Sequence, residues 1–160
     1  MKQQAAPTSR SIQIVTVICL VMTGVFFVGA CFRRELLWGA LFLGLLEAYC
    51  YWFWTPIAYE LDQDALTVVF RRSRKRFAPV IRCSPVRERP GFGVRLWGNS
   101  GLFAGAGYFW SKRYGLFQAY VTRAKHTEWV LVETRNRKVI ISPGDPASFV
   151  PSAEKTAGQV

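Results

Sequence analysis

Two long stretches near the start of the chain contain almost only apolar residues, and a short polar turn separates them. The first, Ile12–Phe32, has no charge, and the second, Leu36–Ile57, has one, Glu47. A helix of about 20 residues crosses the roughly 30 Å of hydrocarbon in a bilayer. The pattern therefore predicts an N-terminal tail over 1–11 and two transmembrane helices, 12–32 and 36–57, joined by the turn 33–35 into an antiparallel hairpin.

After the second stretch, apolar and polar residues alternate in short segments that Pro, Gly, Asn and Asp separate. Alternation with a period of two indicates strands with one buried face, and many short strands are typical of a β sandwich or barrel. We expect a polar hairpin loop at 71–76 and a turn at 87–91. Pro79 and Pro85 should bend their strand or confine it to a sheet edge. The predicted strands are 58–61, 66–70, 77–86, 92–98, 115–122, 128–134 and 138–143.

The pattern changes again at the end of the chain, where a short helix is predicted. Ser142 or Asp145 can cap this helix, and Pro146 suits its first turn. Pro151 ends it early, and 151–160 has the composition of a disordered tail.

Three segments of this second half resemble the bacterial pleckstrin-homology-like (bacterial PH) domains. They are 59–68 (YELDQDALTV), 98–109 (GNSGLFAGAGYF) with 115–122 after it, and 139–150 (VIISPGDPASFV). The resemblance implies a strongly bent antiparallel β sandwich or barrel with a C-terminal capping helix, commonly preceded by membrane helices. The expected protein is therefore an α+β membrane protein, with a transmembrane hairpin followed by a PH-like β domain over 58–150.

Basic residues predict the orientation of the hairpin, in a chain whose net charge is +11. Lys2 and Arg10 precede the first helix and the basic segment 71–76 follows the second, whereas the turn holds only Arg33 and Arg34. The positive-inside rule places the more basic side in the cytoplasm. We therefore expect a multi-pass protein of the bacterial inner membrane with both termini in the cytoplasm.

A rival interpretation starts from Val28–Cys31 (VGAC), which is similar to a bacterial lipoprotein cleavage site with Cys31 as the lipidated residue. Cleavage there would allow the β domain to face the other way. However, the preceding apolar run is longer than the roughly 7–15 residues of a signal peptide core. A second apolar stretch also follows at once, which favours the uncleaved hairpin.

Glu47 lies near the middle of the second apolar stretch. A charge at mid-membrane costs about 3 kcal/mol or more, so such a residue is by default a functional candidate. One structural interpretation is a protonated Glu47 that hydrogen-bonds to Thr23 on the first helix, and another is a contact between copies of the chain. The functional alternative is a role as an accessory to a membrane enzyme or transporter. Proton relays use several acidic or histidine groups, and no second one was identified beside Glu47.

The stretch 98–115 (GNSGLFAGAGYFWSKRYG) mixes glycines with aromatic residues. A phosphate-binding loop would lead into a helix, but this stretch leads into another strand, which argues against a nucleotide site. One interpretation is a sharp β corner in which glycines allow positive φ and close strand approach. The other is a surface loop whose Phe103, Tyr108 and Trp110 contact lipid or a partner.

The segment 71–76 (RRSRKR) has five basic residues in six and follows the second helix closely. Near anionic lipid each basic residue contributes about 1 kcal/mol of binding free energy. Alternatively, the segment only determines topology or forms a solvated hairpin tip. The candidate lipid-binding residues are Arg71, Arg72, Arg74, Lys75, Arg76, Phe103, Trp110, Lys112 and Arg113.

The sequence contains no motif that indicates an enzyme, a cofactor or a metal site. Its four cysteines form no CxxC pair, His126 is the one histidine, and HExxH and GxSxG are absent. Despite the basic composition, no nucleic-acid-binding motif is present. We expect non-enzymatic binding to an anionic lipid surface, without cofactor, metal or nucleic acid. The alternative is a protein-interaction module that assembles with itself or with a membrane-protein partner through an exposed strand edge.

Overall fold

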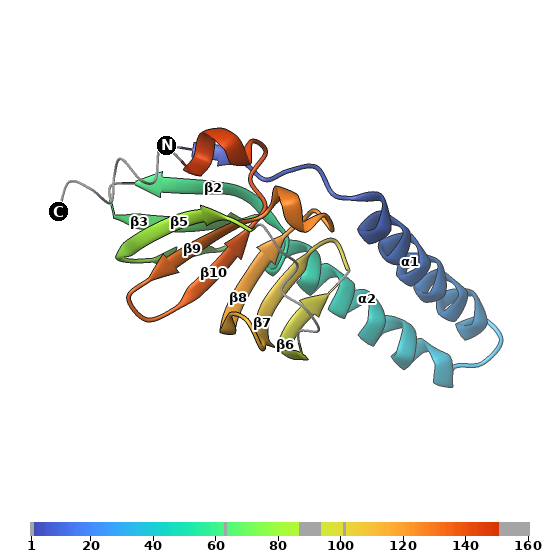
Figure 1. Cartoon of the computed structure of the whole chain (residues 1–160). Coiled ribbons are helices and arrows are strands. Elements are labelled where there is room, and N and C mark those ends of the chain that lie inside the picture. Colours follow the sequence, from blue (N-terminus) through green and yellow to red (C-terminus); the bar gives the residue numbers. More distant parts are fainter. Residues whose placement is uncertain (1, 63, 87–93, 101, 151–160) are drawn as a thin grey trace.

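The chain forms two connected parts, a helical hairpin and a β domain (Figure 1). The structure is a computed structural model that describes residues 2–62, 64–86, 94–100 and 102–150. The helices are α1 (Arg10–Ala30), α2 (Glu35–Phe53), the 3₁₀ helix η1 (His126–Glu128) and a short helix over 146–150. The strands are β1 (Lys2–Gln4), β2 (Pro56–Asp62), β3 (Ala65–Phe70), β4 (Arg74–Phe77), β5 (Val80–Pro85), β6 (Val94–Ser100), β7 (Gly105–Ser111), β8 (Gly115–Val121), β9 (Val130–Thr134) and β10 (Lys138–Ile141).

The two helices of the hairpin are each long and apolar enough to cross a membrane. Their bounds differ from those expected, because α1 already begins at Arg10 and α2 ends at Phe53 instead of residue 57. Pro56 explains the early end, since a proline has no N–H to donate and disfavours helical geometry in the residue before it. The chain enters β2 at Pro56, so residues 56 and 57 belong to the β domain.

The β domain consists of two sheets. The first has the strand order β1-β2-β3-β4, and the second has the order β5-β9-β10-β8-β7-β6. Strand neighbours are antiparallel as expected, with one exception: β8 and β10 are parallel, with Ile140 opposite Ala119. The long connection through η1 and the β9–β10 hairpin returns the chain beside β8 in the same direction. β5 contains Pro85 and begins just after Pro79, and it lies at a sheet edge, as these two prolines predict.

The prediction that 71–76 is a loop was wrong, because only residues 71–73 form a turn and Arg74–Phe77 form β4. Alternate residues of β4 face opposite sides of the first sheet. Arg74 and Arg76 are exposed, whereas Phe77 is buried and Lys75 is half-buried. Pairing with β3, in which Val68 lies opposite Lys75, keeps this basic segment in the sheet.

The main hydrophobic core lies between the two sheets. Fully buried Tyr59, Leu66 and Val68 of the first sheet pack with residues of the second, among them Val132 and Ile141. A second cluster lies on the other face of the second sheet. The middle strands of that sheet are therefore buried on both faces, which is why their sequences read as nearly continuous apolar runs. The second cluster contains Val86, Phe117, Ala119, Val121, Leu131 and Ile140.

The short C-terminal helix closes one end of the core. Asp145 Oδ1 accepts hydrogen bonds from the backbone N–H groups of Ala147 (3.1 Å) and Ser148 (3.4 Å), so Asp145 is the cap, one of the two predicted residues. Phe149 is fully buried between the sheets. The predicted turn at 87–91, the start of the strand predicted at 92–98, Pro151 and the tail 151–160 lie outside the described residues.

The residues before α1 belong to the β domain as well. β1 pairs antiparallel with β2, and Lys2 Nζ lies 2.8 Å from the carboxylate of Glu60, which lowers the pKa of that carboxyl. The backbone then continues along the domain through hydrogen bonds from Ala6 N–H to the Ser142 carbonyl and from Ser9 N–H to the Thr122 carbonyl. One β domain therefore holds both ends of the helical hairpin.

We expect Thr122→Val to destabilise the protein by about 1–3 kcal/mol, because the change leaves a buried acceptor without its donor. Thr122 Oγ1 is buried and donates to the Ala6 carbonyl at 2.6 Å. Thermal unfolding of the full chain in detergent, followed by circular dichroism, measures the effect. Thr127→Val, at an exposed position of η1, is the matched control. Equal melting temperatures for the two variants would contradict this assignment.

Candidate functional site

The loop between β6 and β7, residues 102–104, packs against the helical hairpin. Phe103 N–H donates to Thr16 Oγ1 of α1 at 2.9 Å. The ring of Phe103 meets the ring of Tyr51 of α2 edge-on, with 5.2 Å between their centroids. The loop is thus fixed to both helices at once, near the end of the hairpin at which α2 leads into β2.

Each backbone N–H group of this loop has a hydrogen-bond partner within the protein. Leu102 N–H donates to Asn99 Oδ1 at 3.2 Å, and Ala104 N–H donates to the Leu102 carbonyl at 2.8 Å. Asn99 Nδ2 also donates to that carbonyl. Together with the bond from Phe103 to Thr16, these contacts leave no N–H of residues 102–104 dependent on water.

Two glycines allow the strands that carry this loop to cross very closely. Gly98 and Gly107 are paired between β6 and β7 and have φ values of 124° and 148°. A Cβ on Gly98 would lie 2.3 Å from the Ala106 carbonyl oxygen, and one on Gly107 would lie 2.2 Å from the Trp97 carbonyl oxygen. The expected role of glycine, positive φ with close strand approach, is confirmed at these two positions. The stretch 98–115 is not one corner, however, but two strands with the start of a third.

Gly107→Ala should destabilise the β6–β7 pair by more than about 1 kcal/mol, because both the positive φ and the neighbouring backbone exclude a Cβ. Thermal unfolding of the full chain in detergent measures this loss. Gly115→Ala is the control, since Gly115 has a φ of 66° but a Cβ added there would meet no atom within 4 Å. An alanine at 107 that costs no more than one at 115 would refute the steric argument.

Thr16→Val should loosen the β6–β7 loop, because valine keeps the shape of threonine but cannot accept the hydrogen bond from Phe103. An unsatisfied N–H costs about 1–3 kcal/mol, so we expect faster hydrogen exchange at the Phe103 amide in detergent-purified protein. Thr16→Ser retains the hydroxyl and should retain the protection. If all three proteins exchange this amide equally fast, Thr16 does not hold the loop.

The turn between β3 and β4 lies at the same end of the hairpin. The guanidinium of Arg71 lies over the ring of Tyr51, 4.3 Å from its centroid, and that of Arg72 lies 5.2 Å from the centroid of Trp52. Arg72 N–H also donates to the Trp52 carbonyl at 3.3 Å. Tyr51 therefore contacts both Arg71 and Phe103, and it joins two of the segments that the sequence analysis selected.

Lys75 does not belong with the exposed arginines, although it was predicted with them. Its position on β4 directs it between the sheets, where Nζ donates to the Tyr120 hydroxyl at 2.8 Å. The ammonium also lies 5.4 Å from the ring centroid of Tyr108 and 5.7 Å from that of Phe77. Tyr120 donates its own hydrogen to Gln118 Oε1, and burial, with Tyr108 nearby, raises the pKa of its hydroxyl. Lys75 thus has a role in the domain interior.

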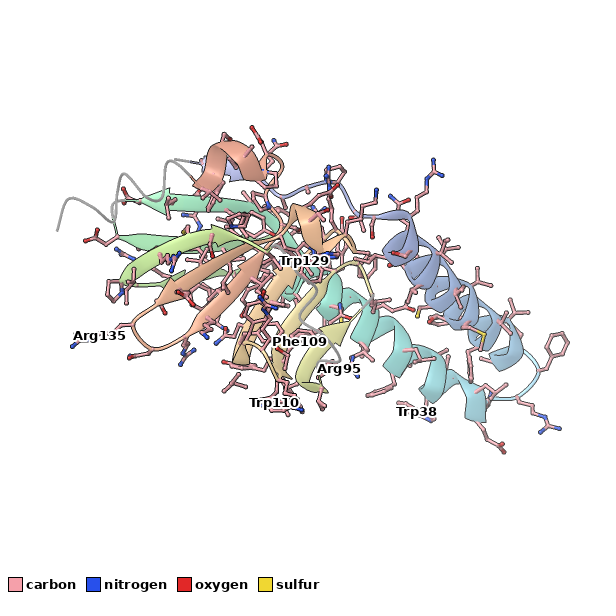
Figure 2. All side chains as sticks on the ribbon, viewed as in Figure 1. Trp38, Arg95, Phe109, Trp110, Trp129 and Arg135 are labelled. Carbon is pink, nitrogen blue, oxygen red and sulfur yellow. The ribbon has the colours of Figure 1, made fainter. Side chains whose placement is uncertain are left out.

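The remaining candidates lie elsewhere on the domain. Trp110 stands near the end of β7 far from the 102–104 loop, as Figure 2 shows, and Lys112 and Arg113 are exposed in the turn that follows. The guanidinium of Arg113 lies 6.0 Å from the ring centroid of Tyr114. The structure therefore brings Phe103 together with Arg71 and Arg72, but it separates these residues from the β7–β8 turn.

Sequence reasoning missed four apolar residues beside Trp110. Val94, Leu96 and Trp97 of β6 and Leu116 of β8 are exposed, and Trp97 is 72% exposed. The alternating pattern of 94–97 could have indicated them, but a register shift between Arg95 and Trp97 interrupts the alternation.

Glu47 is buried in the hairpin and has the partner considered from the sequence. Thr23 Oγ1 donates to Glu47 Oε1 at 2.8 Å, and both side chains are buried between the helices. The contact links the two helices near the middle of each. Among the described residues, His, Cys, Asp and Glu form no group of three that could hold a metal ion.

Comparison with known proteins gives one match. The family model of the bacterial PH domain matches residues 57–157. No curated protein and no solved structure matches the chain. The match begins where α2 gives way to β2 and so coincides with the β domain, although β1 lies outside it.

Proposed function

The chain belongs to the bacterial PH domain family, and we propose that it is an integral membrane protein whose domain binds an anionic lipid surface without catalysis. In this proposal α1 and α2 span the bacterial inner membrane. The β domain lies at the cytoplasmic face, with both chain ends on that side. A PH-like domain is consistent with either lipid or protein interaction.

The surface of the helical hairpin supports the membrane assignment. Large apolar side chains are exposed at ten of the 21 positions of α1, among them Ile14, Val17, Ile18, Val21 and Val25. A helix that is apolar on all sides is stable only inside a protein core or in lipid. Since the β domain does not cover these side chains, lipid is the remaining solvent for them.

The pairing of β1 with β2 supports the proposed topology. Because one domain holds the residues before α1 and those after α2, the two ends of the hairpin must lie on the same side of the membrane. The larger number of Lys and Arg near these ends favours the cytoplasm. Lipoprotein cleavage before Cys31 would release β1 from the chain, which further favours the intact hairpin.

The observation that carries the lipid proposal is the position of the β3–β4 turn. Arg71 and Arg72 lie on aromatic residues of the last turn of α2, and Arg74 and Arg76 are exposed on the adjoining strand. If α2 ends at the membrane surface, the guanidinium groups of Arg71 and Arg72 lie at the level of the phosphates. Guanidinium groups form bidentate hydrogen bonds with phosphate and so suit this position.

The double variant Arg71→Gln, Arg72→Gln should lose about 2 kcal/mol of binding free energy for phosphatidylglycerol. Native mass spectrometry of the full chain, released from mixed phosphatidylglycerol and phosphatidylcholine, counts the retained lipids. Arg135→Gln, Arg137→Gln is the matched control, because it removes the same charge from the β9–β10 turn, and Arg135 lies far from the helices (Figure 2). The double variant Arg71→Lys, Arg72→Lys should keep most of the preference for phosphatidylglycerol over phosphatidylcholine.

Two results would contradict the lipid proposal. One is a wild-type chain that retains both lipids equally, and the other is an equal loss in the two double glutamine variants. Either result would favour the second candidate, a protein-interaction module. Edge strands of the two sheets, such as β4 and β6, would then be its contact surfaces.

A further inference from the structure

The exposed apolar residues of β6, β7 and β8 form a continuous patch. Val94 lies opposite Trp110 across the β6–β7 pair, and Trp110 lies opposite Leu116 across the β7–β8 pair. Directly paired residues point to the same face of a sheet, so these three side chains form one row. Trp97, opposite Tyr108, belongs to the next row on that face. We name Val94, Trp97, Trp110 and Leu116 the apolar patch.

The row of Val94, Trp110 and Leu116 continues the core-facing side of the second sheet. Tyr120 of β8 packs in the core between the sheets. Leu116 lies on the same face of β8, four residues before Tyr120. The first sheet covers Tyr120 but leaves the side chain of Leu116 exposed. A sheet face that is apolar beyond the edge of its covering sheet requires another apolar neighbour.

Contacts at one end of β6 and β7 join this part of the second sheet to the helical hairpin. The loop between these strands touches Thr16 and Tyr51, and a Cβ on Gly98 of β6 would lie 3.0 Å from the ring of Trp54, just after α2. In Figure 1, β6 is the strand of the second sheet drawn nearest to α2, and β5 and β9 are drawn farther away. The patch therefore lies on strands whose other end is attached to the hairpin.

We propose that the apolar patch rests in the boundary between headgroups and acyl chains of the same bilayer that the hairpin spans. The inference rests on the proposed membrane insertion but not on selectivity for anionic lipid. Tryptophan, with its apolar ring and N–H donor, is favoured at this boundary, and the patch contributes Trp97 and Trp110. Lys112 and Arg113 follow Trp110 after one residue, Ser111, and are placed to reach the phosphates.

The edge position of β6 limits the depth of this contact. Among the strands that the structure describes, β6 pairs only with β7, so its other side presents backbone N–H and C=O groups to which none of these strands pairs. Such groups are too costly for the hydrocarbon interior but are accommodated in the hydrated headgroup region. The side chains of the patch therefore enter the lipid while the strand stays at the surface, and the domain lies against the membrane.

Site-specific photo-cross-linking in the full chain tests this contact. Benzoylphenylalanine replaces Trp97 or Trp110 in protein embedded in phosphatidylcholine nanodiscs, and mass spectrometry identifies the adducts formed on irradiation. Leu45, exposed on α2, is the position expected to label lipid. Ile81 is the matched control, because it is an equally apolar exposed residue (58%) on β5, at the opposite edge of the same sheet.

We expect lipid adducts at positions 97, 110 and 45 and no such adducts at position 81. Adducts at 97 and 110 as scarce as those at 81 would overturn the proposal, as would adducts with a protein in place of lipid. If position 45 also labels no lipid, the membrane insertion of the hairpin is refuted instead. The cross-linking uses neutral lipid alone. A negative result with the Arg71 and Arg72 variants would therefore leave the cross-linking result unaffected.

Discussion

The hydrogen bonds between β1 and β2 join the residues before α1 to the residues after α2, and the positions of the other parts depend on this pairing. Because this pairing makes β1 part of the β domain, the domain is connected through the chain to α1 as well as to α2. The open end of the hairpin is thereby closed. Phe103 and Arg72 add contacts from two further segments, through Thr16 and Trp52. The domain is thereby held in one orientation relative to the hairpin, which is what fixes the surface it presents to its surroundings.

Apolar side chains have three different environments in this chain. Residues such as Tyr59 and Val68 are buried between the sheets, residues such as Leu131 and Ile140 are buried on the outer face of the second sheet, and the surface of the hairpin is exposed. The high apolar content is therefore compatible with a strongly basic composition, because most of the charged residues that the structure describes lie on the surface of the β domain, in the turns or at the helix ends. Glu47 inside the hairpin and Lys75 inside the β domain are exceptions. Aromatic rings and the hydroxyl of Tyr120 surround the ammonium group of Lys75.

Features with strong local causes could be predicted from the sequence. Uninterrupted apolar runs indicated the hairpin, alternation indicated most strands, Asp145 was one of two predicted caps, and the glycines of 98–115 indicated the close strand approach found at Gly98 and Gly107. The sequence could not indicate β1, a polar triplet that becomes a strand only because β2 offers it an edge. For the same reason the basic run 71–76 concealed β4, whose pairing with β3 and anchoring by Phe77 override its composition. The candidate site was predicted only in part, since the direction of Lys75 and the exposure of Trp97 depend on tertiary packing.

The place of β1 in the sheet also has a consequence for the order of events during synthesis. β1 leaves the ribosome before its partner β2, which emerges only after both helices have been made, and the Ser142 carbonyl that binds Ala6 emerges later still. If the hairpin spans a membrane as proposed, β1 has to stay on the side on which β2 will emerge until nearly the whole domain has appeared. In that proposal, a first helix inserted in the reverse direction would separate β1 from β2 and leave the sheet incomplete. Completion of the sheet would then depend on the direction in which the first helix inserts.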